Sequence, residues 1–96
     1  MSNNEYMWII QSSKSRNIVG CFFKQEDAEQ FIYKHQLQCI LTQFPMDQSV
    51  YDWVIENGFW KPKFESQTQG EFISDFSSAY LKHTHFNQVH LNQEVD

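Results

Sequence analysis

Residues 25–36, QEDAEQFIYKHQ, show the clearest periodicity in this chain of 96 residues. The residues on one side follow the helical spacing i, i+3, i+4, i+7: Ala28, Phe31, Ile32 and His35. Acidic residues occupy the first turn and Lys34 the last, as the helix dipole favours. The stretch therefore predicts an amphipathic helix over about 25–36, with Phe31 and Ile32 buried against the rest of the fold.

The segments on both sides of this helix have the composition of strands. Residues 6–11 and 18–23 are rich in β-branched and aromatic residues and are separated by a polar turn, which predicts an antiparallel hairpin. Gly20 within the second run predicts a bulge or a close approach of another backbone. A third strand is predicted at 38–44, where Pro45 stops it because proline donates no ladder hydrogen bond.

Residues 50–56 alternate in a way that predicts a fourth strand, followed by a turn at Asn57-Gly58. On this prediction Tyr51, Trp53 and Ile55 share one face. The opposite face mixes apolar and acidic residues, so the strand is expected to be central and partly covered on both sides.

The C-terminal third gives weaker patterns. Residues 65–70 are polar and are predicted to form a flexible loop. A short second helix is predicted near 71–81 from four apolar positions: Phe72, Ile73, Phe76 and Tyr80. An edge strand is predicted within 81–91, and 93–96 are expected to fray.

Together these elements predict an α+β fold. We expect an antiparallel sheet of four to five strands with the helix over about 25–36 packed on one face. The length predicts a single domain over 1–96.

Composition narrows the classes of function. The formal net charge is −5 and only seven residues are basic, which argues against unaided binding to nucleic acid. An acidic surface suits a basic protein partner, although acidity also serves solubility. The apolar run at 6–10 is far too short to span a bilayer, and residues 1–5 have no secretory signal, so we expect a cytoplasmic protein without membrane partners.

The two cysteines, Cys21 and Cys39, are each flanked by apolar residues. In a chain without an export signal they are expected to be free, buried thiols, with a single disulfide as the alternative.

Constellations for catalysis are absent from the sequence. There is no Ser-His-Asp or Cys-His signature and no phosphate loop, so we expect no enzyme and no cofactor. Asp47, Asp52 and Glu56 are the carboxylates that could serve as paired general acid and base. We expect structural roles for them instead, such as hydrogen bonds within turns.

His83-Thr84-His85 is the one arrangement typical of metal ligands. On a strand both imidazoles would point to the same side, and His90 or Asp75 could complete a ligand set. Two histidines without a further ligand at fixed spacing are a weak signal, and no metal is expected.

The aromatic block 51–64 is the best candidate for a binding surface. Phe59 and Trp60 precede Lys61-Pro62-Lys63, and aromatic rings beside lysines can stack on nucleic-acid bases. Since the chain is acidic, a protein interface is the favoured use of these rings, with packing in the core as the alternative.

The chain resembles a family of small bacterial proteins of about this length with no assigned activity. The residues that carry the resemblance are Trp8-Ile9-Ile10, Gly20-Cys21-Phe22, the predicted helix from Ala28 to His35, Leu41-Thr42-Gln43-Phe44-Pro45-Met46-Asp47, Val50-Tyr51-Asp52-Trp53-Val54-Ile55, Gly58-Phe59-Trp60-Lys61-Pro62, Phe76-Ser77-Ser78-Ala79-Tyr80-Leu81 and His83-Thr84-His85-Phe86. The resemblance implies an α+β fold and provides no catalytic residues. Ser49 stands where relatives often have Gly, which argues against a turn with positive φ at that position.

Small acidic proteins of this kind are often immunity proteins encoded beside secreted toxins. The leading hypothesis is therefore a non-catalytic immunity protein that binds a basic toxin domain and blocks its active site. The residues expected to bind this partner are Asp47, Glu56, Phe59 and Trp60. The alternative is a small metal- or ligand-binding regulatory domain that uses His83 and His85.

Overall fold

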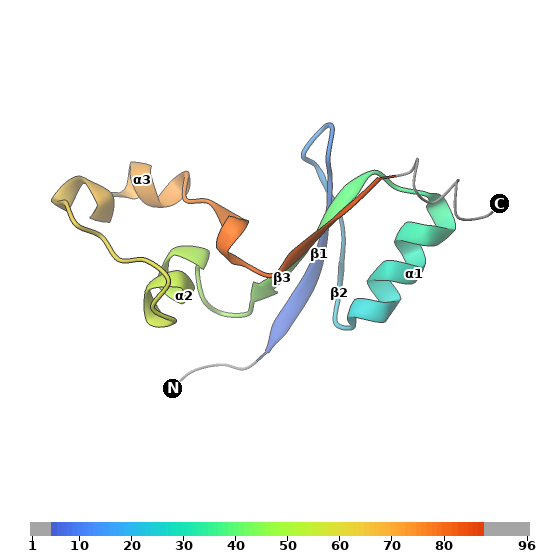
Figure 1. Cartoon of the computed structure of the whole chain (residues 1–96), viewed down its shortest axis with the longest axis horizontal. Helices are drawn as coiled ribbons and strands as arrows, with labels where there is room; N and C mark the ends of the chain where they lie inside the picture. The colour runs from blue at the N-terminus through green and yellow to red at the C-terminus, as the bar shows by residue number, and fades with distance from the viewer. Residues whose placement is uncertain (1–4, 88–96) are drawn as a thin grey trace.

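The computed structural model describes residues 5–87 and confirms an α+β fold (Figure 1). The elements follow the order β1 (Tyr6–Ser12), β2 (Ile18–Phe22), α1 (Gln25–His35), β3 (Cys39–Pro45), α2 (Val50–Glu56), η1 (Glu65–Thr68), α3 (Gly70–Ser74), η2 (Ser78–Tyr80) and β4 (His83–Phe86), where η marks a 3₁₀ helix. The expected fraying of 93–96 concerns residues outside this range.

The four strands form one antiparallel sheet in the order β2-β1-β3-β4. The predicted hairpin is confirmed as β1 and β2, the third strand as β3 extended through Pro45, and the C-terminal edge strand as β4. The register shifts between Ile10 and Gln11, which pair with Gly20 and Ile18 and leave Val19 as the extra residue of a bulge. The bulge expected near Gly20 is therefore present, and a Cβ atom on Gly20 would lie 3.1 Å from the side-chain ring of Phe22, not close to another backbone.

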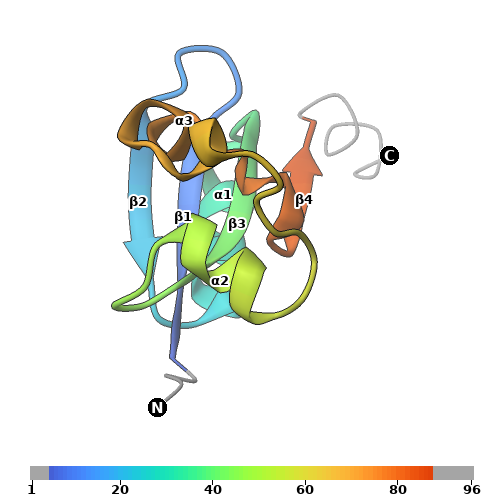
Figure 2. The same cartoon turned by 90° about the vertical axis from the view of Figure 1, so that its left-hand side faces the viewer.

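Helix α1 packs on one face of the sheet, as predicted (Figures 1 and 2). The buried core between them is formed by Trp8, Ile10, Ala28, Ile32, Cys39 and Leu41. Phe31, predicted to be buried with Ile32, is only partly buried, because it lies at the rim of this core between the rings of Phe22 and His35.

The C-terminal end of α1 is closed by backbone hydrogen bonds. Gln36 adopts a left-handed conformation with φ of 52°. Its N–H donates to the carbonyl of Tyr33, and the N–H of Leu37 donates to the carbonyl of Ile32. These two bonds form a Schellman motif, a position where glycine is the usual residue.

The prediction of a strand over 50–56 is wrong, because this segment is helix α2. Ser49 starts the helix by accepting a hydrogen bond from the Asp52 N–H at 2.9 Å, and its φ of −73° agrees with the absence of a turn with positive φ there. Gly58, with φ of 76°, ends it: the N–H groups of Gly58 and Phe59 donate to Ile55 and Val54. The predicted turn at Asn57-Gly58 thus terminates a helix instead of connecting two strands.

The C-terminal third also differs from its prediction. The expected flexible loop at 65–70 contains η1, and the expected helix near 71–81 is split into α3 and η2. Serines explain the split. The Ser74 hydroxyl donates to the Gly70 carbonyl within α3, while Ser77 accepts from the Ala79 N–H and starts a new turn.

A second apolar region lies on the other side of the sheet from α1, among α2, α3 and η2 (Figure 2). We call it the aromatic cluster, and its rings are Tyr51, Trp60, Phe72, Phe76 and Tyr80. The Tyr51 hydroxyl donates to the Gln67 carbonyl at 2.8 Å, which ties α2 to η1. The helices of this region are therefore joined by rings and side-chain hydrogen bonds.

The two cysteines are free thiols, as predicted, but only Cys39 is buried. Cys21 is exposed on the edge strand β2, where its side chain points away from α1, so its predicted burial is wrong. Burial raises the pKa of the Cys39 thiol to about 11, because the low-polarity core disfavours the thiolate.

Candidate functional site

Three of the four predicted partner-binding residues lie at the surface near the C-terminal end of α2. Glu56 is the last residue of the helix, and Asp47 lies in the turn that follows β3, with φ of 60°. The Gln48 side-chain amide donates to the Glu56 carboxylate, so this turn is held against the end of α2. Asp47, Glu56 and Phe59 are all exposed.

Phe59 is an apolar ring held in place at the surface. It is 57 % exposed, yet it stacks on Trp53 with ring centroids 5.6 Å apart and planes at 29°. Trp53 is in turn fixed by a hydrogen bond of 3.3 Å from its Nε1 to the Tyr6 hydroxyl. The exposed ring therefore rests on a second ring that is tied to the first strand of the sheet.

Trp60, predicted to share the surface with Phe59, has a different environment. It is half-buried in the aromatic cluster, with ring centroids 5.9 Å from Tyr51, 5.7 Å from Phe72 and 5.1 Å from Phe76. A ring with three aromatic neighbours contributes mainly to packing. The structure thus separates the two residues: Phe59 is exposed to solvent, whereas Trp60 packs in the aromatic cluster.

A groove of about 550 Å³ runs beside Phe59. Its lining combines the end of α2 with the segment that follows: Ile55, Gly58, Phe59, Trp60, Lys61 and Lys63. The groove is open to solvent and carries positive charge from its two lysines, whereas Asp47 and Glu56 lie on the preceding segments. Charged side chains of both signs therefore lie near Phe59.

His83 and His85 both lie on the edge strand β4 and point to the same side of it, with ring centroids 5.3 Å apart. Asp75, considered as a further ligand, is the exposed C-cap of α3, and His90 lies outside the described residues. Within residues 5–87 no group of three or more His, Cys, Asp or Glu side chains could hold a metal ion. The two histidines instead line a separate pocket with residues of the sheet and η2.

The support of Phe59 by Trp53 was not foreseen, because a strand over 50–56 would have placed these rings differently. The signal that could have revealed it is the pair of helix ends. Ser49 is followed three residues later by Asp52, and Asn57-Gly58 follows the last apolar residues, which together are typical of a short capped helix.

No helix among the described residues is long and apolar enough to cross a membrane. A family model with the description "Domain of unknown function (DUF7710)" matches residues 7–92 of the chain. No curated protein and no solved structure matches the chain significantly.

Proposed function

The chain belongs to this family of domains of unknown function, and we propose from its own residues that it is a non-catalytic protein that binds a protein partner. The proposed contact is the α2-end surface, defined as Asp47, Glu56, Phe59, Lys61 and Lys63. We propose further that the partner is a toxin domain, that the chain acts as its immunity protein, and that it does so in the cytoplasm.

The main observation behind the proposal is that the exposed Phe59 ring is held in place by stacking on Trp53. Large apolar rings contribute most to binding when they are fixed before the partner arrives, because less conformational entropy is then lost. Phe59 is 57 % exposed but stacked on Trp53, which is itself held by Tyr6. The neighbouring groove of about 550 Å³ could receive a side chain of the partner.

The charged side chains around Phe59 are suited to form the polar rim of a protein–protein interface. Such rims set the rate of association and the choice of partner more than the affinity. Glu56 and Asp47 would meet basic groups, and the net charge of −5 would steer a basic partner toward the chain. Lys61 and Lys63, which line the groove beside the ring, would meet acidic groups.

The assignment of a toxin as the partner rests on analogy with small acidic single-domain proteins encoded beside secreted toxins. In that role the chain would block the toxin by covering its active site, which requires no catalytic group of its own. The candidate toxins are the domains encoded beside the gene for this chain.

The decisive variant is Phe59→Ala. Loss of a central ring should weaken binding by about 2 kcal/mol or more, which is about thirtyfold in Kd. Titration with the toxin domain encoded beside the gene would measure Kd, and co-expression with that toxin would measure protection of cells. Phe23→Ala is the matched control, because Phe23 is also exposed but lies between β2 and α1.

A second variant keeps the test independent of folding. Phe59→Leu retains most of the apolar area and should bind better than Phe59→Ala, while thermal melting of both should stay close to that of the native chain. Equal affinities for the native chain and a folded Phe59→Ala variant would remove this surface from the interface. Failure of every neighbouring toxin domain to bind the native chain would overturn the immunity role itself.

A further inference from the structure

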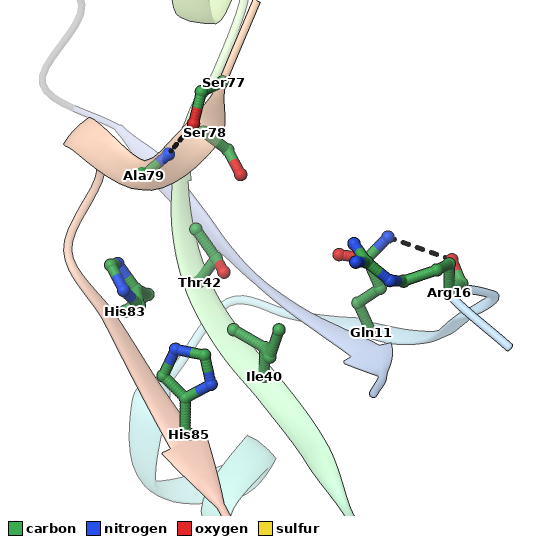
Figure 3. A pocket seen from close by; sticks show the side chains of 9 residues that line it. All are labelled: Gln11, Arg16, Ile40, Thr42, Ser77, Ser78, Ala79, His83 and His85. Carbon is green, nitrogen blue, oxygen red and sulfur yellow. Dashed lines mark hydrogen bonds between the residues drawn. The ribbon is translucent and has the colours of Figure 1, made fainter. Parts of the chain in front are cut away.

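The face of the sheet opposite α1 carries a pocket of about 180 Å³ between the strands and η2 (Figure 3). This volume is below the range of roughly 300–1,000 Å³ that holds drug-sized ligands. The pocket suits a small molecule, and the chemistry of its lining indicates which kind.

Strand register explains why polar residues meet there. Ile40 of β3 pairs with Gln11 of β1 on one side and with His85 of β4 on the other, so the three side chains form one row across the sheet. His83 lies in the next row, opposite Thr42. Three segments far apart in the sequence thus place polar groups on one face.

Arg16 reaches the same face from the turn of the β1–β2 hairpin. The Gln11 side-chain amide donates to the Arg16 carbonyl at 2.9 Å, which holds this turn beside the row. Figure 3 shows Arg16 and Gln11 on one side of Ile40 and the two imidazoles on the other. The pocket therefore has two polar ends with an aliphatic side chain between them.

The protonation of His83 is constrained by its neighbour. Its Nδ1 lies 2.7 Å from the Leu81 carbonyl, and since a carbonyl only accepts, Nδ1 carries the hydrogen of this bond. Nε2 remains to interact with a ligand, as an acceptor in the neutral ring and as a donor in the imidazolium. His85 stands beside it with ring centroids 5.3 Å apart.

The charges of the lining favour an anion over a cation. Arg16 is permanently charged, both histidines can become imidazolium, and none of the residues that line this pocket is Asp or Glu, although the chain has a net charge of −5. The Ser78 hydroxyl adds a further donor at the rim. A metal ion at the imidazoles would face the guanidinium across the pocket and would lack a third strong ligand within residues 5–87.

We propose that this pocket binds a short dicarboxylate. One carboxylate pairs with the Arg16 guanidinium, and the carbon chain lies over Ile40. The other carboxylate accepts hydrogen bonds from His85 and from the Nε2–H that His83 carries as imidazolium. The site is separate from the α2-end surface, and this proposal does not depend on whether the chain binds a protein partner.

Succinate is the probe, and acetate is the matched ligand that lacks the second carboxylate. We would titrate each into the full chain while recording NMR signals of the imidazoles of His83 and His85 and of the backbone amide of Ile40. Succinate should shift these signals in a saturable way and bind about tenfold tighter than acetate, since a second charge-assisted contact contributes at least about 1.4 kcal/mol.

Arg16→Gln and the double variant His83→Gln/His85→Gln should each weaken succinate binding about tenfold. Lys14→Gln is the control, because it removes the same charge from the same hairpin turn without lining the pocket, and its affinity should stay within about twofold of native. All these residues are exposed, so melting should show that the variants fold.

Three results would overturn the proposal: equal affinities for succinate and acetate, equal effects of Lys14→Gln and Arg16→Gln, or shifts of the imidazole signals with zinc alone and none with succinate. The first would remove the second anchoring point, the second would reduce binding to general charge attraction, and the third would make the histidines a metal site.

Discussion

The two apolar regions of this molecule are built differently. The core under α1 is largely aliphatic, and Ile10, Ile32 and Leu41 in it are completely buried. The aromatic cluster is made of rings that are mostly half-buried, and Tyr80 at its edge remains 43 % exposed. Burial of apolar area is the main source of stability, so the first region should dominate the free energy of unfolding.

The difference follows from the elements that each region joins. Paired strands and an eleven-residue helix shield whole side chains from water. The segments around the aromatic cluster are short helices of three to seven residues, which are too short to be stable without tertiary contacts. Rings bridge such segments because each has a large area and favourable edge-to-face geometry. We therefore expect the aromatic cluster to open locally before the sheet unfolds.

The largest expected effect is that of Leu41→Ala. Removal of a fully buried aliphatic side chain should lower the free energy of unfolding by about 3–5 kcal/mol, because transfer and cavity terms add. Urea denaturation followed by circular dichroism would measure this. Ile18→Ala, at a residue that is 60 % exposed, should change the same quantity by less than about 0.5 kcal/mol. Similar losses for the two variants would contradict the placement of the core.

Trp60→Ala tests the other region. We expect a cost of about 2 kcal/mol, below that of a fully buried ring, since Trp60 is half-buried. Hydrogen exchange should accelerate at 50–80 and stay nearly native in β1, β2 and β3. Equal acceleration across the sheet would show that the two regions unfold as one unit.

Tyr51→Phe removes one hydrogen bond from the aromatic cluster and leaves the ring in place. Loss of the bond from the Tyr51 hydroxyl to the Gln67 carbonyl should cost about 1 kcal/mol. Exchange of amides in η1 would report it. Tyr80→Phe, at a ring that is 43 % exposed, is the control and should change little. Equal effects would mean that the Tyr51 bond does not hold η1.

Gln36→Gly should stabilise the α1 region slightly, by about 0.5 kcal/mol. Glycine adopts the φ of 52° without a Cβ clash, although it also gains freedom in the unfolded chain. Asp47→Gly, at φ of 60°, offers the matched change near the aromatic cluster and should gain less, because Asp tolerates this conformation better. Thermal melting would measure both. A loss of stability for Gln36→Gly would show that the Gln36 side chain contributes more than the backbone strain costs.

The prediction with the smallest expected effect concerns the reactivity of the two native thiols, Cys21 and Cys39. At pH 8 a thiol reagent should label the exposed Cys21 quickly and Cys39 slowly, because burial raises the pKa of Cys39 to about 11 and keeps it protonated. The contribution of the Cys39 thiol to the free energy of unfolding is fully present below pH 9.0. It is lost as the pH rises toward 11, because the thiol of the unfolded chain releases its proton at a lower pH than the buried thiol does. In the Cys39→Ala variant the free energy of unfolding should depend less on pH between 9.0 and about 11. Equal labelling rates at pH 8 would show that the core under α1 opens readily.

Part of the candidate site could be read from the sequence. Helix ends at Ser49 and Asn57-Gly58 were present as local signals, but the alternation of Tyr51, Trp53 and Ile55 led to the prediction of a strand. A seven-residue segment can satisfy both patterns, and its capping groups, which depend on local hydrogen bonds, favour the helix. The exposure of Phe59 was foreseen as one of two alternatives, whereas its support by Trp53 required the helix to be in place.

The sequence by itself determined the elements whose signals are local: the hairpin of β1 and β2, helix α1 and strand β3, where periodicity, turn residues and charge agree over several residues. Only the tertiary structure decided which of two adjacent rings, Phe59 or Trp60, faces solvent, and that Arg16 shares a pocket with His83 and His85. Such decisions depend on strand order and on contacts between segments far apart in the chain. No pattern within one segment records these contacts, because their free energy arises only when the segments meet.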